Sequence, residues 1–140
     1  MDPLTVGRDA LRRRAPEVVE AFEHVEGVAA DSVEPATLAM VRDRVAALLD
    51  LPAPAPDDAL DGARAASIDS WHSSPAFDER DRAVLAFVEQ FVFSVSSMGD
   101  AEVDALLVDR SPAQVHELAN AVWAVDLGAR VDHVAGVVLG

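Results

Sequence analysis

The chain is 140 residues long and 51% of them are hydrophobic, which predicts a single domain with enough apolar material for one core. Its 25 acidic side chains against 11 basic ones give a formal net charge of −14, which disfavours nucleic acids and anionic membranes as partners. Cysteine is absent, so disulfides, thiolate metal sites and cysteine nucleophiles are excluded, and we expect neither a metal nor a cofactor.

The N-terminal segment, residues 1–15, is charged and has no apolar stretch. It therefore predicts neither a signal peptide nor a membrane anchor, and we expect a cytoplasmic protein. We treat residues 16–140 as the helical domain.

Helical periodicity begins at Pro16, where apolar residues recur at spacings of three and four, namely Val18, Phe22, Val25 and Ala29. A second helix is expected from Pro35 to near Asp50, with an apolar line of Leu38, Val41, Val45 and Leu48. Three alternating prolines within residues 51–56 then predict a short, extended connector, because each removes an amide donor.

Asp57 or Asp58 is expected to cap a third helix that runs towards Trp71. Asp78 is expected to cap the longest clear helix, which has a broad apolar face of Val84, Phe87, Val88, Phe91, Val92 and Val95. Its aromatic residues Phe87, Phe91 and Phe93, together with Trp123, predict core or subunit-interface positions.

Gly99 and Asp100 supply a stop and a new start for a short helix. Ser111, Pro112 and Gln114 together form a helix start with a capping box, and that last helix is expected to run nearly to the C-terminus. No segment alternates as a β-strand would, so the sequence predicts an all-α, single-domain bundle of about six helices.

Several segments agree in order with one known family. The stretch 71–77 reads WHSSPAF and is followed by ERDRAVLAFVE over residues 79–89, while RDRVAALL precedes it at 42–49. SPAQVHEL at 111–118 and DLGAR at 126–130 follow it. Together these segments resemble the alkylhydroperoxidase D/carboxymuconolactone decarboxylase family over most of the chain from residue 16.

The resemblance implies a helical fold, assembly into a homo-oligomer and, in active members, a Cys-x-x-Cys pair with a histidine and an upstream glutamate. One thiolate attacks the peroxide, and the second thiol resolves the sulfenic acid. Aligned on residues 44–46, the two cysteine positions fall on Leu51 and Pro54, the histidine on Asp58 and the glutamate on Ala39. All four are lost, and thiol peroxidase chemistry is excluded by the absence of cysteine.

Three residues are candidates for a remaining pocket: His72, Glu89 and Arg130. Glu89 matches a glutamate of the family and could transfer a proton, while Arg130 could hold a carboxylate. Each also has a plainer interpretation, as a solvated loop histidine, a solvated glutamate, and an i,i+4 ion pair between Asp126 and Arg130.

Three functions follow from these observations. The first is a non-catalytic oligomeric scaffold, which we favour because every redox position is lost. The second is a divergent, cysteine-independent enzyme, such as a decarboxylase-like lyase acting on a small carboxylic acid. The third is a module that binds a small apolar or carboxylate ligand in the vacated pocket.

Overall fold

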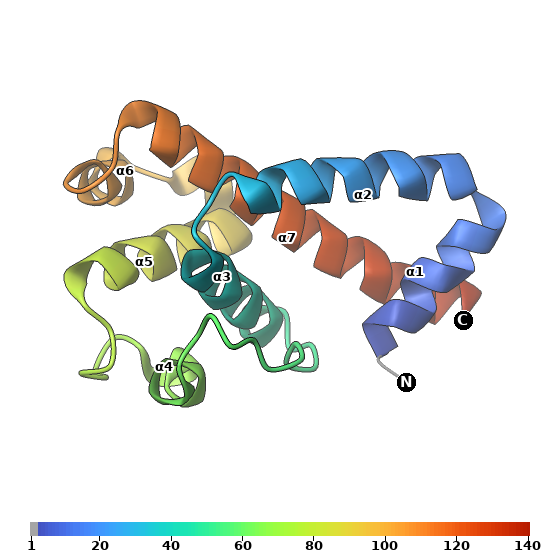
Figure 1. The fold of residues 1–140 in the computed structure, drawn as a ribbon, viewed down its shortest axis with the longest axis horizontal. Helices are drawn as coiled ribbons and strands as arrows, with labels where there is room; N and C mark the ends of the chain where they lie inside the picture. Colours follow the sequence, from blue (N-terminus) through green and yellow to red (C-terminus); the bar gives the residue numbers. More distant parts are fainter. Residues whose placement is uncertain (1–2) are drawn as a thin grey trace.

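In the computed structural model, which describes residues 3–140, the chain forms seven α-helices, two short 3-10 helices and no β-strand (Figure 1). This confirms the predicted all-α bundle. The helices are α1 (Pro3–Arg14), α2 (Pro16–Asp31), α3 (Pro35–Leu48), α4 (Gly62–Ala66), η1 (Ile68–Ser70), α5 (Glu79–Ser94), η2 (Val95–Ser97), α6 (Asp100–Leu107) and α7 (Pro112–Leu139). Within residues 3–140, no helix is both long enough and apolar enough to cross a membrane.

The long helix α7 joins two groups of helices (Figure 1). Helix α5 packs on both α3 and α6, and all three pack on α7, whereas α1 and α2 pack on α7 and on each other. Figure 1 shows the first group around the N-terminal half of α7 and the second along its C-terminal half. Helix α3 touches α7 where the two groups meet, so the junction is formed by α2, α3 and α7.

The core lies between α3, α5 and α7. Its largest fully buried side chains come from these helices and from α6, namely Met40, Leu85, Leu106, Leu118, Val41, Val45, Val84, Val88 and Val122. Phe87 is buried there as predicted, whereas Phe93 and Trp123 lie on the surface with 70% and 44% of their area exposed. Burial of such aliphatic side chains contributes about 1.5–3 kcal/mol each, so this region dominates the stability of the fold.

Two predicted helix starts are confirmed by their capping geometry. The Asp78 carboxylate accepts the backbone N–H of Asp81 at 2.8 Å, and the Asp81 side chain accepts the N–H of Asp78 in return. Ser111 and Gln114 form the same reciprocal pair at the start of α7, with Pro112 at its first position. Both satisfy amide donors that the helix itself leaves without partners.

The predicted capping residue of the third helix was wrong. Asp61, and not Asp57 or Asp58, caps α4, because its carboxylate accepts the backbone N–H of Arg64 at 2.8 Å. Asp57 instead closes a local turn by accepting the N–H of Ala59 at 2.9 Å, and Asp58 is exposed within that turn. A short aspartate side chain can serve either purpose, so the prolines before it did not decide which one acts as the cap.

Helix α1 was not predicted, since residues 1–15 were treated as a charged segment without a helix. Its buried face is formed by the small residues Gly7 and Ala10, which give little hydrophobic periodicity. A Cβ atom at Gly7 would overlap the carbonyl oxygen of Asp132 and lie 2.7 Å from the amide nitrogen of Gly136. The backbones of α1 and α7 are therefore in direct contact, which only a glycine allows at this position.

Candidate functional site

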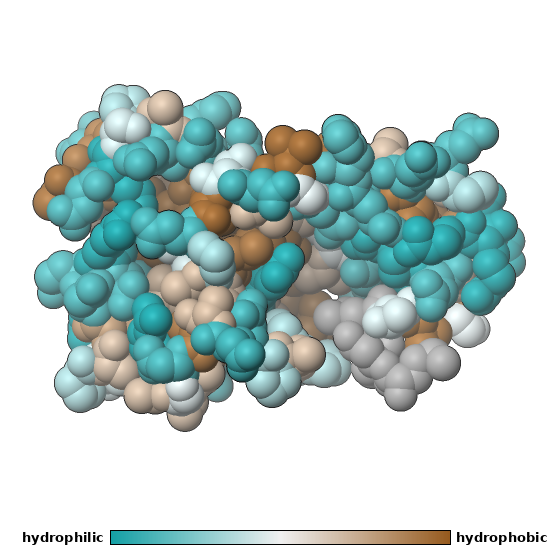
Figure 2. Space-filling model, viewed as in Figure 1, coloured by the Kyte–Doolittle hydropathy of each residue, from teal (hydrophilic) through white to brown (hydrophobic). Residues whose placement is uncertain are grey.

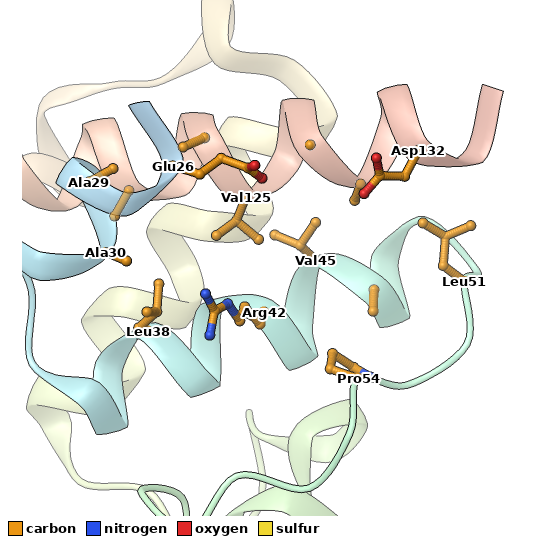
Figure 3. A pocket seen from close by; sticks show the side chains of 15 residues that line it. Glu26, Ala29, Ala30, Leu38, Arg42, Val45, Leu51, Pro54, Val125 and Asp132 are labelled. Atoms are coloured by element: carbon orange, nitrogen blue, oxygen red, sulfur yellow. The ribbon is translucent and has the colours of Figure 1, made fainter. Parts of the chain in front are cut away.

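A cavity of about 190 Å³ lies between α2, α3 and α7, at the junction of the two helix groups (Figure 3). Its lining is mostly small and apolar and includes Ala30, Leu38, Val45, Leu51, Pro54 and Val125. Figure 2 shows apolar residues in the hollow between the two parts of the molecule, surrounded by hydrophilic ones. An apolar cavity of about 150 Å³ accommodates benzene, so this one has room for roughly seven or eight non-hydrogen atoms.

The backbone turn at the end of α3 forms one wall of this cavity. Asp50 has a φ of 54°, the N–H of Leu51 donates to the carbonyl of Ala46 at 2.9 Å, and the N–H of Asp50 donates to that of Ala47 at 3.2 Å. These two hydrogen bonds define a Schellman motif, which turns the chain back on the helix that it ends. Leu51 and Pro54 both line the cavity, and they are the two positions at which the family resemblance places cysteines.

A partly buried ionic cluster closes the end of the cavity near α1. Arg8 Nε donates to Asp132 Oδ1 and Arg8 Nη1 donates to Glu26 Oε1, each at 2.6 Å, and the guanidinium lies 5.2 Å from the centre of the Phe22 ring. Burial alone would lower the pKa of Arg8, but the hydrogen bonds to the two carboxylates outweigh it, and the pKa lies above its ordinary value. A Cβ at Gly128 would lie 2.7 Å from Glu26 Oε2, so this glycine makes room for the cluster.

Arg42 is the cation at the open side of the cavity. It projects from α3 beside the apolar lining, with its side chain exposed (Figure 3). In the described part of the chain, its guanidinium has no hydrogen bond and no ion pair, whereas the two acidic residues that line the cavity are held by Arg8. An anionic group entering the cavity would therefore meet one positive charge that is free to pair with it.

A second, wider cavity of about 530 Å³ lies under the proline connector and shares Arg42 and Pro54 with the first. Ala39 lines it, and so do Asp43 and Asp57. Burial and then the nearby charge of Asp57 raise the pKa of Asp43 above its ordinary value. Ala39, where the resemblance places a glutamate, thus contributes only a methyl group to a cavity whose charged lining residues are Arg42, Asp43 and Asp57.

Two of the three predicted site residues lie together. His72 Nε2 lies 3.6 Å from Glu89 Oε2, and the His72 ring stacks on Trp71 with ring centres 3.7 Å apart. Glu89 Oε1 also accepts the Trp71 indole N–H at 2.8 Å and Arg44 Nη2 at 2.6 Å. Only 11% of the Arg44 side chain is exposed, so this cluster ties the loop that carries Trp71 to α3 and α5.

Arg130, the third predicted site residue, forms a separate set of contacts. Its Nε donates to Asp126 Oδ1 at 2.8 Å, which is the expected i,i+4 pair, and its Nη2 donates to the backbone carbonyl of Val92 at 3.2 Å. Among the hydrogen bonds and ion pairs of residues 3–140, none joins Arg130 to His72 or Glu89. The three predicted residues therefore do not form one pocket.

Arg42 and Arg8 were not among the site residues predicted from the sequence. Arg42 lies four residues after Leu38 and three before Val45, and therefore on the same side of the helix as these apolar residues. A charged residue at such a position is a sequence signal that could have identified it as a site candidate. Arg8 gave no such signal, because Glu26 and Asp132 lie 18 and 124 residues away in the sequence.

No group of three or more histidine or carboxylate side chains within residues 3–140 is arranged to hold a metal ion. Comparison of the chain with protein-family models and with curated proteins found no match.

Proposed function

We propose that this chain is a ligand-binding protein on a scaffold similar to that of the alkylhydroperoxidase D family, without thiol chemistry. Its ligand is a small apolar molecule that carries a carboxylate and enters the cavity between α2, α3 and α7. The observation that carries this proposal is an apolar cavity with Arg42 at its opening, an arginine that has no ion-pair partner within residues 3–140. The two side chains at the presumed cysteine positions, Leu51 and Pro54, then serve as apolar walls.

The volume of the cavity sets the size and affinity of the ligand. A chain of five or six carbons fills about 190 Å³ and gains roughly 0.8 kcal/mol for each buried methylene. The resulting 4–5 kcal/mol corresponds to a Kd of about 1 mM or somewhat lower. Pairing with the exposed Arg42 adds about 0.5–1 kcal/mol, since solvent screens the charge.

Hexanoate has the right dimensions to test this proposal, with hexan-1-ol as the uncharged comparison. At ten times its Kd, a ligand stabilises the native state by about 1.4 kcal/mol, which raises Tm by about 3–6 °C in a chain of this size. We expect Arg42→Gln to weaken hexanoate binding about two- to fivefold and to leave hexan-1-ol unaffected. Arg13→Gln, at an exposed arginine of α1, is the matched control.

A substitution that fills the cavity provides the second test. Ala30→Leu places three more carbons in the cavity and should abolish the thermal shift by both ligands. Ala21→Leu adds the same atoms to the exposed side of the same helix and should leave binding unchanged. Equal shifts in Ala30→Leu and in the parent protein, or no saturable shift in the parent protein, would refute the cavity as a binding site.

The oligomeric scaffold is the second candidate, and the exposed apolar end of α7 favours it. Val134, Val137 and Val138 are exposed by 57%, 72% and 71%, beside the half-buried Leu11 of α1. Exposed apolar patches of this kind are common at protein interfaces. Light scattering after size-exclusion chromatography tests it: a single dimer or higher oligomer that Val138→Asp dissociates would support this candidate, and a monomer at all concentrations would contradict it.

A cysteine-independent enzyme has less support. The Glu89 carboxylate, its candidate proton carrier, already accepts hydrogen bonds from Trp71 and Arg44. Arg130, its candidate carboxylate ligand, is paired with Asp126.

A further inference from the structure

A third, smaller cavity of about 70 Å³ lies at the other end of α3, where the turn between α2 and α3 meets the first turns of α5 and α7. Two arginines from different parts of the chain line it, Arg80 in α5 and Arg110 just before α7. Thr37, which is buried in the first turn of α3, lines it as well. This cavity shares no lining residue with the one proposed to bind an apolar ligand.

Both arginines bury a nitrogen atom that has no acceptor. In the described chain, Arg80 Nε and Arg110 Nη1 are shielded from solvent and have no hydrogen-bond partner. A buried N–H donor without an acceptor is costly, and most native proteins avoid it. Two such donors on two arginines that line one cavity indicate a missing acceptor between them.

The carboxylates around the cavity do not supply that acceptor. Glu34 pairs with Arg80 through Nη2 at 3.0 Å but leaves Nε without a partner, and Glu34 is largely exposed. Asp81, Asp109 and Glu117 lie nearby, yet no carboxylate within residues 3–140 forms an ion pair with Arg110. Burial and then the charge of Arg80 lower the pKa of Arg110, and the opposing charges of Glu34, Asp109 and Asp81 do not fully offset them.

We propose that Arg80 and Arg110 bind a small oxyanion, either as a free ion or as the phosphoryl, sulfate or carboxylate group of a larger molecule. The cavity has the volume for one such group. Guanidinium N–H groups are well matched to the oxygens of phosphate and carboxylate, and one ion supplies acceptors to both arginines at once. Water would satisfy the two donors but would leave the repulsion between the two charges.

Thermal unfolding in inorganic phosphate, sulfate and acetate, each against sodium chloride at the same ionic strength, tests this site. We expect a saturable rise of Tm in at least one of the three, of about 3–6 °C at ten times its Kd. Comparing the tetrahedral ions with acetate identifies which group the site prefers. An equal, non-saturating response to all salts would overturn the proposal, because that is the behaviour of a general salt effect.

Arg110→Gln separates a binding role from a structural one. It removes a buried, like-charged donor, so without added anion the variant should unfold at the same temperature as the parent protein or higher, and its response to the anion should be lost. Arg13→Gln, at an exposed arginine, should keep the full response. If Arg110→Gln does not fold, calorimetric titration of the parent protein with phosphate, sulfate and acetate decides instead: no saturable heat with any of the three refutes the site. Ala30→Leu fills the other cavity and should keep the response to the anion, so failure of one site is distinguishable from failure of the other.

Discussion

Arg8 makes the most consequential polar contacts that join the two ends of the chain. Its side chain is only 13% exposed and lies between Glu26 of α2 and Asp132 of α7, with both N–O distances at 2.6 Å. Each of these pairs is worth about 4 kcal/mol at a charge separation near 4 Å and an effective dielectric constant of about 20. Desolvation of the guanidinium cancels much of that gain. Arg8→Met, which keeps the apolar stem, should therefore cost about 2–4 kcal/mol, largely because it leaves two acids close together.

Urea denaturation followed by far-UV circular dichroism measures this loss as a lower midpoint at an unchanged m-value. In a thermal melt the same loss amounts to about 4–16 °C. Arg12→Met is the matched control on the same helix, since Arg12 pairs with Glu23 at 2.6 Å but is 47% exposed, and it should cost less than about 1 kcal/mol. Adding Glu26→Gln to Arg8→Met should restore part of the loss. Equal costs for the two arginine variants would refute the reasoning.

Three further substitutions test the helix contacts and the connector. Gly7→Ala should lower the free energy of unfolding by about 2 kcal/mol or more, because the added methyl group forces α1 away from α7. Gly27→Ala should raise the free energy of unfolding by about 0.5–1 kcal/mol, because a Cβ there has nothing within 4 Å. Urea titration measures both changes. Asp43→Asn should raise Tm at pH 7, because burial and the charge of Asp57 raise the pKa of Asp43, so that ionising this carboxyl destabilises the fold. The gain in Tm should vanish below about pH 3.8, where the carboxyl is protonated in both the folded and the unfolded chain. A gain that does not depend on pH would contradict this explanation. Asp50→Gly should stabilise by about 0.5–1 kcal/mol, since its φ of 54° suits glycine better than aspartate, and a loss of stability in urea would show that the aspartate side chain matters there.

The sequence predicted those features whose signals are local. The starts of α5 and α7 depend on a capping residue and its partner three positions later, so both partners lie within four consecutive residues of the sequence. Helix α1 was missed for the opposite reason, because it is held by Gly7 against α7 and by Arg8 against two distant carboxylates. Neither contact leaves a periodic pattern in residues 1–15.

The same contrast between local signals and distant contacts applies to the candidate site. His72 and Glu89 were each chosen as single residues, and the structure places their side chains near each other. Arg42 could have been noticed as a charge on the apolar stripe of α3, but its free guanidinium depends on Arg8 holding the acids across the cavity. A sequence alone cannot show which of several arginines is left without a partner, because that depends on pairs made between distant helices.

The end of α3 bears most directly on the resemblance to a redox family. A chain that passes through a positive φ at Asp50 has left the helix before Leu51, and Pro52, Pro54 and Pro56 then remove the amide donors that a further helical turn would need. Restoring cysteines at positions 51 and 54 would therefore not restore a pair on one helix. The path of the backbone, as well as the absence of cysteine, is therefore unsuited to such a pair at these positions. The same turn directs the chain back against α3, so the geometry that ends the helix before Leu51 also places Leu51 in the apolar wall of the cavity.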